Sequence, residues 1–503
     1  MITRIKSAGI LGYEVIEVQI EVDISSGLPN VSIVGLPDTA VKESRERIRA
    51  AIRNTGLDIP KGRLTISLAP ADVKKEGNYF DLPIALGILG ENGQISKERL
   101  KEFTVVGELG LDGTVRKVNG LLGIIAQSKE GENIIFPWGN RYEASLIENR
   151  NLYPVRTLSE AIEILRSPNP EPYKEKENIV NEPEYEMDLS EVKGQALAKK
   201  ALEISAAGGH NLIMIGPPGS GKTMLARRMI TILPPLEREE IIETTRIYSI
   251  AGLLESNHVI TCPPFRAPHH SSSSPAIVGG GNPPRPGEIS LSHNGVLFLD
   301  ELPEFRRDVL EALREPLEEG FIRIARAGTS TKFPARFILV CAMNPCPCGY
   351  YTSKKRTCTC SPYQVQRYRK KVSGPLIDRI DLQVEVTDVD PNILHQEDHQ
   401  EETSATVRER VIAARNIQKE RFRRCGISLN SQMTHRQIKR YCNLSDEGKN
   451  ILKQGMEQLQ LSARAHNKVI KISRTIADLE GSDQIKPEHI LQALTFRMSQ
   501  LWT

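Results

Sequence analysis

The chain has 503 residues, of which 39% are hydrophobic and 26% charged, and its formal net charge is +3. A chain of this length exceeds one hydrophobic core, so we expect about two to four domains. The small net charge excludes nucleic-acid binding through a global positive field and leaves only local basic patches for that role. No run of eighteen apolar residues occurs, so we predict no membrane span, no signal peptide and a cytoplasmic protein that binds no membrane.

Residues 1–165 have the pattern of a mixed α/β domain. Charged residues interleaved with apolar ones predict a helix at Asp38–Asn54. Residues 166–188 are rich in Pro and Glu and poor in apolar side chains, which is typical of a linker. Stretches rich in β-branched residues, the first of them alternating, predict strands at Tyr13–Val22, Leu64–Leu68 and Phe103–Val106.

The stretch FTVVGELGLDGTVRKVNGLLGIIAQSKEGENIIFP, residues 103–137, resembles the proteolytic domain of Lon, a fold shared with domain 2 of ribosomal protein S5. By this resemblance Tyr79 stands where Lon has its serine, and Ile124 stands where Lon has its lysine. A hydroxyl nucleophile without a base is hard to activate. The resemblance therefore implies an inactive Lon-like domain with a structural or DNA-facing role.

The stretch NLIMIGPPGSGKTMLARRMITIL, from Asn211, is an apolar strand, a glycine-rich turn and the start of a helix. It fits the complete phosphate-binding loop, in which backbone N–H groups face an anion at a helix N-terminus. Lys222 is expected to reach the β- and γ-phosphates of ATP, and the Thr223 hydroxyl to hold Mg²⁺. The predicted cofactor-binding residues are Gly216, Pro217, Pro218, Gly219, Ser220, Gly221, Lys222 and Thr223.

Two further apolar strands end in residues that suit ATP hydrolysis. The strand Val296–Leu299 is followed directly by Asp300 and Glu301. Asp300 is expected to hold Mg²⁺, and Glu301 to orient or deprotonate the attacking water. The strand in ARFILVCAMNP ends at Asn344, whose amide could polarise that water. An ATPase follows from these residues together with the phosphate loop.

The order of these motifs resembles AAA+ ATPases, and in particular the branch that holds the MCM helicases and the magnesium-chelatase ATPase subunit. The resemblance rests on two stretches, GEISLSHNGVLFLDE at residues 287–301 and IARAGTSTKFPARFILVCAMNP at residues 324–345. It implies a hairpin insert around Val278–Asn294 and a second hairpin around Phe321–Phe337. It also implies an arginine finger at Arg379, in GPLIDRIDL, that reaches the γ-phosphate bound to a neighbouring subunit.

Four cysteines follow the Asn344 strand in the segment 346–360. Two Cys-x-Cys units across a nine-residue loop predict a tetrahedral thiolate site, with zinc as the expected metal. Reduced structural thiols and a redox disulfide remain the alternatives. The insert has no long apolar run, so a metal would supply its folding energy. The predicted ligands are Cys346, Cys348, Cys358 and Cys360.

Basic residues lie in the second predicted hairpin and beside the clustered cysteines. The MCM-like hairpin tip Ile324–Gly328 carries Arg326, which the resemblance places in a central pore. Around the cysteines, basic residues alternate with tyrosines, a mixture that suits a nucleic-acid backbone with occasional base stacking. A solvated basic face or a subunit contact is the alternative. The predicted nucleic-acid residues are Arg323, Arg326, Lys332, Lys354, Lys355 and Arg356.

Residues 189–395 are expected to form the ATPase core and residues 396–503 a helical lid. In the lid, LSARAHNKVIKISRTIADLE resembles the second sensor of AAA+ proteins, which points to Arg464, with Arg474 as the competing choice. Apolar spacing predicts helices at Thr406–Arg421, Asp446–Leu459 and Ala463–Leu479.

The whole layout, a Lon-like domain, a linker, a chelatase-type core and a lid, resembles the YifB/ComM family of magnesium chelatase-like proteins. The resemblance implies ATP and Mg²⁺ as cofactors and a hexameric ring that moves branched or single-stranded DNA, in branch migration or as a helicase. The alternative is a chelatase-type ATPase that remodels a protein partner or a metal-inserting complex without touching DNA.

Overall fold

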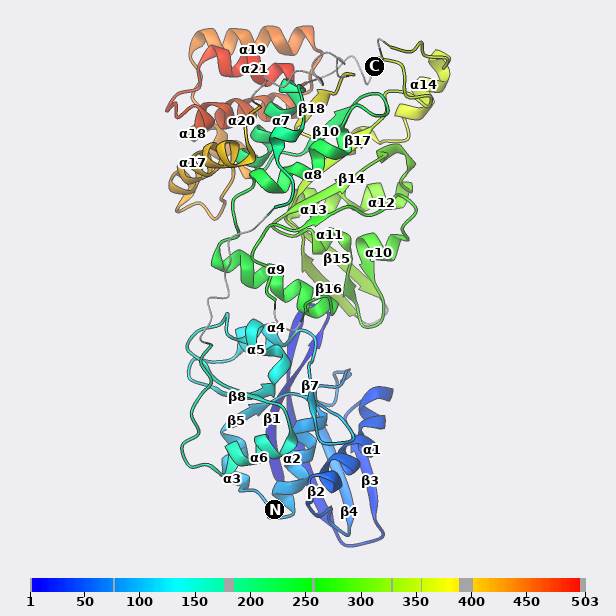
Figure 1. Cartoon of the computed structure of the whole chain (residues 1–503), viewed down its shortest axis with the longest axis vertical. Coiled ribbons are helices and arrows are strands. Elements are labelled where there is room, and N and C mark those ends of the chain that lie inside the picture. Colours follow the sequence, from blue (N-terminus) through cyan, green and yellow to red (C-terminus); the bar gives the residue numbers. More distant parts are fainter. Residues whose placement is uncertain are drawn as a thin grey trace.

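The computed structural model describes residues 2–75, 77–175, 185–255, 258–326, 329–353, 355–388 and 401–497. The molecule is elongated, with an N-terminal sheet at one end, a parallel sheet in the middle and the C-terminal helices at the other end (Figure 1). The mixed α/β class with a helical C-terminus is thereby confirmed. Parts of the predicted linker and of the predicted core–lid boundary, residues 176–184 and 389–400, lie outside the described residues.

The N-terminal sheet has seven strands in the order β3-β4-β2-β1-β5-β8-β9. Its centre is the antiparallel hairpin of β1 and β2, in which the alternation EVIEVQIEVDIS buries Val18, Ile20 and Val22. A separate two-stranded sheet pairs β6 with β7. The strands are β1 (Thr3–Leu11), β2 (Glu14–Ser25), β3 (Asn30–Val34), β4 (Arg63–Ala69), β5 (Phe103–Val105), β6 (Glu108–Leu109), β7 (Val115–Arg116), β8 (Asn133–Pro137) and β9 (Asn151–Val155).

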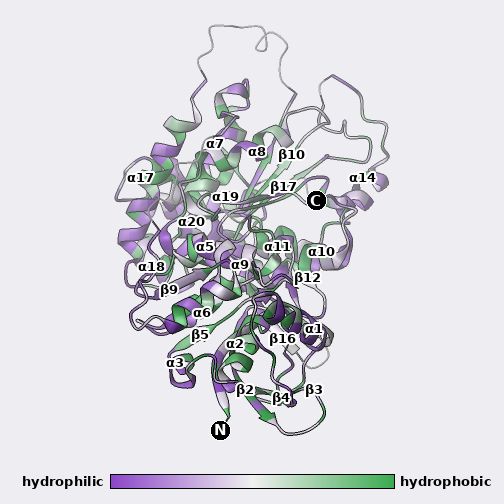
Figure 2. Ribbon diagram, turned by 60° about the horizontal axis from the view of Figure 1, so that its bottom comes forward, coloured by the Kyte–Doolittle hydropathy of each residue, from purple (hydrophilic) through white to green (hydrophobic). Residues whose placement is uncertain are grey.

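Six helices are described in this N-terminal part. α1 begins where predicted, because the Asp38 carboxylate caps it by accepting from the Val41 N–H. The sequence DLPIALGILGE makes α2 apolar on nearly all sides, so it is buried as the central helix of this core (Figure 2). The helices are α1 (Thr39–Asn54), α2 (Asp81–Glu91), α3 (Lys97–Lys101), α4 (Leu121–Gln127), α5 (Arg141–Ala144) and α6 (Leu158–Arg166).

The middle sheet has five parallel strands in the order β11-β14-β17-β10-β18. Parallel pairing brings the carboxyl ends of all five strands to one edge. Two short hairpins, β12–β13 and β15–β16, lie within the predicted insert ranges. The strands are β10 (Leu212–Ile215), β11 (Phe265–Arg266), β12 (Gly279–Gly280), β13 (Arg285–Pro286), β14 (Val296–Leu299), β15 (Phe321–Arg326), β16 (Thr329–Pro334), β17 (Ile338–Met343) and β18 (Leu382–Glu385).

Helices surround this sheet and continue into the C-terminal part, where α17, α19 and α20 match the predicted helices within two residues at each end. Among the described helices, none is long and apolar enough to cross a membrane. The helices are α7 (Ala196–Gly208), α8 (Lys222–Ile232), α9 (Arg238–Ala251), α10 (Ser274–Val278), α11 (Glu288–Leu291), α12 (Arg307–Ala312), α13 (Arg314–Glu319), α14 (Pro362–Arg369), α15 (Gly374–Ile377), α17 (Ser404–Phe422), α18 (His435–Tyr441), α19 (Asp446–Gln458), α20 (Ala463–Leu479) and α21 (Pro487–Thr495).

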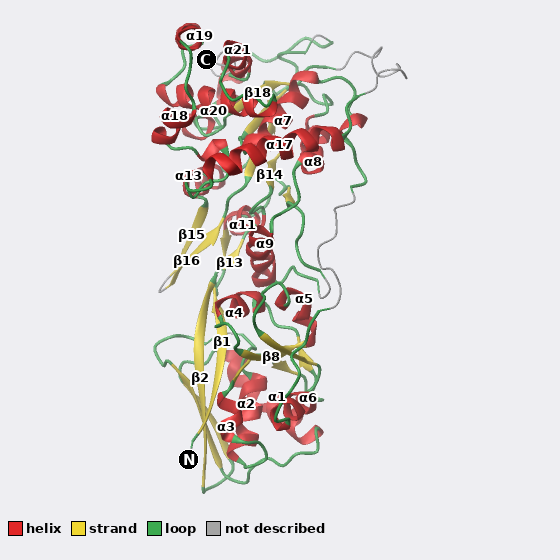
Figure 3. Cartoon of the chain, turned by 90° about the vertical axis from the view of Figure 1, so that its left-hand side faces the viewer, coloured by secondary structure: helices red, strands yellow, loops and turns green. Residues whose placement is uncertain are grey.

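The turn between β1 and β2 reaches from the N-terminal sheet to the second domain (Figure 3). The Tyr13 ring packs edge-on against Phe333 of β16, with ring centroids 6.1 Å apart. Arg246 of α9 lies over the same ring at 4.0 Å and donates a hydrogen bond to the Tyr13 carbonyl at 2.6 Å. The N-terminal domain therefore braces the base of the β15–β16 hairpin.

Candidate nucleotide, metal and nucleic-acid sites

The phosphate loop joins strand β10, which lies between β17 and β18, to α8. Its first residue, Gly216, lies so close to β18 that a Cβ there would be 2.1 Å from the carbonyl oxygen of Val386. Gly221 precedes α8 with a φ of 90°, so the free N–H groups of the first helical turn open onto the loop. This is the backbone geometry that an anion site at a helix N-terminus requires.

Lys222 is folded onto this loop. Its Nζ donates to the carbonyls of Gly216 and Pro217, at 2.7 and 2.8 Å. Burial lowers the pKa of Lys222 to about 8, while the charges of Asp300 and Asp388 act in the opposite direction. A bound phosphate would add negative charge beside the ammonium group and so favour its charged form.

Strand register brings the other predicted residues to the same edge. Ile215 pairs with Met343, so Asn344 leaves β17 beside the phosphate loop, and its Oδ1 lies 3.4 Å from Lys222 Nζ. Asp300 follows β14, which pairs with the other side of β17. The Thr223 hydroxyl donates to Asp300 Oδ2 at 2.6 Å. A hydroxyl and a carboxylate oxygen this close suit coordination of one Mg²⁺ ion.

Glu301 occupies a strained turn immediately after Asp300. Its φ of 53° is unusual for a residue other than glycine, and such strain is concentrated at functional sites. The Asp300 carboxylate accepts from the Glu301 N–H at 2.9 Å and fixes the turn. The Glu301 side chain is exposed at the edge, where it could accept a proton from water.

Sequence reasoning missed one neighbour of this carboxylate. His270 Nδ1 lies 3.2 Å from Glu301 Oε2. The histidine follows β11, and β11 pairs in parallel with β14, so both loops leave the same edge of the sheet. The polar run PHHSSSS after a short strand is the signal that could have indicated a residue at this edge.

Arg379, the predicted finger, lies just after α15. Within the chain its Nη1 donates to the Pro375 carbonyl at 2.7 Å, and its Nη2 pairs with Glu318. The guanidinium is thus held by its own domain and would have to leave Glu318 to meet a phosphate.

The two candidates for the second sensor differ in their surroundings. Arg474 is buried, pairs with Asp478 and donates to the carbonyl of Asp483 at 2.8 Å. These bonds belong to the interior of the helical domain. Arg464 is exposed in the first turn of α20. This difference favours Arg464 as the residue available to a nucleotide.

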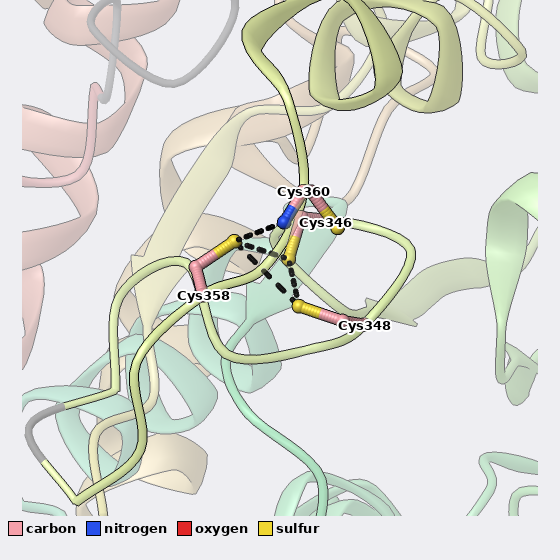
Figure 4. A group of neighbouring side chains, drawn as sticks. All are labelled: Cys346, Cys348, Cys358 and Cys360. Atoms are coloured by element: carbon pink, nitrogen blue, oxygen red, sulfur yellow. Dashed lines mark hydrogen bonds between the residues drawn. The ribbon is translucent and has the colours of Figure 1, made fainter.

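The four clustered cysteines converge on one point (Figure 4). Their sulfur atoms all lie within 4.8 Å of one another, and Cys346, Cys348 and Cys358 are separated by 3.4 to 3.6 Å. Tetrahedral zinc with Zn–S bonds of about 2.3 Å requires sulfur separations of about 3.8 Å, so the group fits the ion. Backbone N–H groups of Tyr350 and Thr359 lower the pKa of Cys348 to about 5, which favours the thiolate that binds metal.

The cysteine cluster adjoins the phosphate loop. Cys346 is two residues beyond Asn344. The segment returns at Gly349, where a Cβ would lie 2.6 Å from the Pro218 ring. Ser353 then donates to Asp388 at 2.9 Å, just beyond β18. The cluster therefore holds a loop against the ATP site.

The structure places only some of the predicted nucleic-acid residues. Arg323 and Lys332 face each other across the β15–β16 hairpin, are both exposed, and lie 5.9 and 4.7 Å from the centre of the Phe321 ring. Arg356 donates to the Tyr350 hydroxyl at 2.9 Å and stacks on its ring. Lys355 lies in the same exposed loop. Lys354 and the side chain of Arg326 lie outside the described residues.

Next to this loop, α14 is largely hydrophilic (Figure 2), and the helix and the residues directly after it supply further basic side chains. Arg369 stacks on the ring of Tyr351 at 5.1 Å, and Lys371 pairs with Glu304. Arg369 also donates to the Pro345 carbonyl at 3.2 Å, between Asn344 and Cys346. Part of this basic surface therefore fixes the cysteine segment itself.

Comparison with known proteins agrees with this geometry. Residues 188–394 match the family "Magnesium chelatase, subunit ChlI", residues 20–140 match "Subunit ChlI of Mg-chelatase", and residues 401–497 match "Magnesium chelatase, subunit ChlI C-terminal". The competence protein ComM of Haemophilus influenzae is 46% identical over 97% of this chain and 96% of its own length. YifB of Escherichia coli is 44% identical over 97% of this chain and 95% of its own.

A weaker likeness covers a smaller part of the chain. The magnesium-chelatase 38 kDa subunit of Cereibacter sphaeroides is 24% identical over 174 residues, which are 31% of this chain and 52% of that protein. The similarity to ComM and YifB, in contrast, extends over nearly the whole length of each protein. The chain belongs to the YifB/ComM family of magnesium chelatase-like AAA+ ATPases.

Proposed function

We propose that the chain is an ATP-driven motor that acts on DNA as a homohexameric ring, in branch migration or strand unwinding during recombination or natural transformation. The observation that carries the proposal is the basic β15–β16 hairpin, which leads directly into the strand that carries Asn344 of the ATP site. A shift of this hairpin would thus be transmitted to the ATP site through β17. The Haemophilus relative is named as a competence protein, which supports the link to DNA uptake.

The ring is proposed from the resemblance of Arg379 to the arginine finger of AAA+ ATPases. Its partners within the chain are Glu318 and Pro375. A finger that completes catalysis must reach a phosphate from outside, so a second copy of the chain would supply it. A closed ring gives each site one finger from its neighbour, and a hexamer is the ring that the family resemblance implies.

The hairpin is proposed to contact DNA in the central channel. Phe321 lies beneath the cationic groups of Arg323 and Lys332, which limits the freedom of both side chains at the exposed surface. Arg326 ends β15, at the turn of the hairpin. Repeated around a ring, these residues would line a channel with positive charge although each chain has a net charge of only +3.

Replacing Arg326 with alanine tests this contact. We expect Arg326→Ala to lower the ratio of the ATPase rate with DNA to the rate without it, and to make DNA binding less dependent on salt, because phosphate contacts release counterions. Arg306→Ala, which removes an exposed arginine paired with Asp308, is the matched control. If DNA stimulates the ATPase of Arg326→Ala as strongly as that of the wild type, the pore contact is contradicted. It is also contradicted if the variant loses ring assembly and not DNA stimulation.

The second candidate is a chelatase-type ATPase that remodels a protein or a metal-inserting complex. The family models that match the chain and the likeness to the 38 kDa chelatase subunit favour it. It predicts an ATPase rate that responds to a protein partner and not to DNA. The same rate measurement with linear, forked and four-way DNA therefore separates the two functions.

The N-terminal domain is proposed to be Lon-like and without proteolytic activity. The hydroxyl of Tyr79 donates to the Asn119 carbonyl at 2.9 Å, and burial raises its pKa. Ile124 is buried in the adjacent core. Neither side chain is suited to nucleophilic catalysis. Contacts such as Tyr13 with Phe333 support a role in bracing the DNA-facing hairpin instead.

The cysteine cluster is proposed to hold one structural zinc ion per chain. A cytoplasmic location would keep these thiols reduced and available to the metal. Bound zinc would fix the loop that carries Tyr350 and Arg356.

Removal of two ligands tests the metal site. We expect the double variant Cys346→Ser, Cys348→Ser to lose its zinc, because two thiolates bind the ion far more weakly than four. Its loop should become disordered and its affinity for DNA should fall, while ATP binding persists through Lys222 and Thr223. Elemental analysis after reducing, chelator-free purification measures the zinc, with Cys262→Ser as the control outside the cluster. Wild-type protein without metal would leave only the structural-thiol interpretation.

A further inference from the structure

The predicted finger lies at the opposite edge of the middle sheet from the phosphate loop of its own chain. Strand β18 begins at Leu382, directly after the finger segment, residues 379–381. Leu382 pairs in parallel with Leu212 at the start of β10, and the phosphate loop follows the other end of β10. The segment is thus a strand length away from its own phosphate loop. The proposed contact with a neighbouring subunit therefore depends on how this segment is held.

Side chains from other elements bond to each main-chain carbonyl of the finger segment. The carbonyl of the finger residue itself accepts from Asn211 Nδ2 at 3.1 Å. The carbonyl of Ile380 accepts from Lys468 Nζ and from Arg497 Nη1, both at 3.1 Å. The carbonyl of Asp381 accepts from Arg497 Nη1 at 2.9 Å. Three successive carbonyls with such partners fix the main chain of the segment in one place.

Lys468 adds an ion pair to its hydrogen bond. Its Nζ lies 2.9 Å from Asp381 Oδ1, and the two side chains are only 16% and 13% exposed, so water screens their attraction weakly. His210 Nδ1 lies 3.4 Å from the other carboxylate oxygen. Burial alone would raise the pKa of Asp381, but the charge of Lys468, together with His210, holds that pKa well below its usual range. The carboxylate is therefore charged and paired with the lysine.

This ion pair joins the sheet to the helical lid. Lys468 belongs to α20, whose first turn carries Arg464, the predicted second sensor, four residues earlier. Residues four apart lie on the same side of a helix, one turn from each other. A displacement of α20 would therefore move Lys468, and the finger segment with it.

We propose that Lys468 is a positioning residue for the arginine finger: it fixes the finger segment against α20, so that Arg379 reaches the nucleotide of the neighbouring subunit. The guanidinium has to leave Glu318 to reach a phosphate, and a fixed main chain directs that movement. The inference rests on the proposed finger and the proposed ring. Lys468 touches no nucleotide in this role, so its loss should impair hydrolysis in the neighbour and leave ATP binding in its own chain intact.

The test uses Lys468→Met in the full-length protein, which removes the charge and keeps the length of the side chain. Because misplacement of a catalytic group by about 1 Å costs about a hundredfold in rate, we expect the ATPase rate to fall about tenfold to a hundredfold. The affinity for labelled ATP should not change. Lys468→Arg, which retains the charge, should recover part of the rate. Lys471→Met is the matched control on the same helix, since Lys471 Nζ donates to the Ser431 carbonyl at 2.7 Å, within the lid.

Mixtures of variants show which site carries the defect. Lys468→Met mixed with Glu301→Gln should recover hydrolysis, because the Glu301→Gln chain supplies a well-placed finger to the intact ATP site of the Lys468→Met chain. Lys468→Met mixed with Arg379→Ala should recover nothing above the rates of the two variants alone, because neither chain supplies a well-placed finger. A general structural defect in Lys468→Met would not give this pattern.

The outcomes separate this inference from the proposed function. A wild-type rate in Lys468→Met would overturn the positioning role. Recovery with Arg379→Ala would also overturn it, as would failure to recover with Glu301→Gln when the subunits exchange, since either result places the defect in the variant's own site. If Arg379→Ala and Glu301→Gln do not complement each other although their subunits exchange, the proposed finger or ring is wrong, and the role of Lys468 is wrong with it.

A second variant covers a failure of Lys468→Met to fold. Removal of one partner of a buried ion pair leaves an unpaired charge, whereas removal of both charges is tolerated better. The double variant Lys468→Met, Asp381→Asn then takes the place of the single one in the same mixtures. It should again complement Glu301→Gln and not Arg379→Ala, and the opposite pattern would overturn the inference.

Discussion

Lys222→Ala is expected to abolish ATP-dependent activity, and Glu301→Gln is expected to bind ATP but not hydrolyse it. The lysine is buried within the phosphate loop, where its Nζ is directed at the loop carbonyls and at Asn344. Removing it takes away the positive charge that binds the β- and γ-phosphates, so both affinity and rate should fall. A correctly placed general base contributes a factor of roughly a hundred to ten thousand, so Glu301→Gln should lose at least two orders of magnitude in rate.

Equilibrium binding of labelled ATP and steady-state hydrolysis measure these two effects separately. Glutamine keeps the size of the Glu301 side chain and removes its basicity, so folding and the Asp300 turn should persist. Lys193→Ala, a substitution outside the phosphate loop, is a suitable control for changes in charge. Near-normal turnover by Glu301→Gln would defeat the assignment of the base.

Arg379→Ala should be as inactive as Glu301→Gln when each is assayed alone, yet a mixture of the two should recover hydrolysis. An arginine finger contributes a factor of about a thousand to a hundred thousand in rate. In a one-to-one mixture, roughly a quarter of the subunit interfaces would pair an intact finger with an intact site, if the ring assembles randomly. The recovered rate should therefore be a minor but clear fraction of the wild-type rate.

The mixing experiment needs a control for subunit exchange. Arg379→Ala mixed with Lys222→Ala should also recover activity, since the finger and the phosphate loop again come from different chains. A sample that contains only Arg379→Ala subunits should stay inactive. If the subunits are shown to exchange between rings and the mixtures are still as inactive as each variant alone, either Arg379 is not the finger or the chain does not form a ring.

Motifs that are local in sequence could be predicted well. The phosphate loop, the Asp300–Glu301 pair and Asn344 each follow an apolar strand, and parallel pairing of those strands brings them together. The cysteine spacing likewise predicted the cluster that the fold assembles. These predictions needed only local sequence patterns and the rule that the carboxyl ends of parallel strands lie at one edge of the sheet.

Contacts between distant segments could not be predicted in this way. His270 meets Glu301 only because β11 lies beside β14, and two paired residues of β11 give little sequence signal. The burial of Arg474 against Asp478, which distinguishes it from the exposed Arg464, likewise depends on packing of the helical domain. The approach of Tyr13 to Phe333 depends on the length and direction of the β1–β2 hairpin, which follow from packing of the whole sheet.

The movement of a four-way DNA junction, coupled to ATP hydrolysis, tests the central claim most directly. A labelled junction with homologous arms should be converted to its products by the wild type with ATP and Mg²⁺, and not with a non-hydrolysable analogue or by Glu301→Gln. The ATPase rate should rise when the same DNA is added. A wild-type chain that hydrolyses ATP but neither moves the junction nor responds to linear, forked or four-way DNA would contradict the motor and favour the chelatase-type alternative.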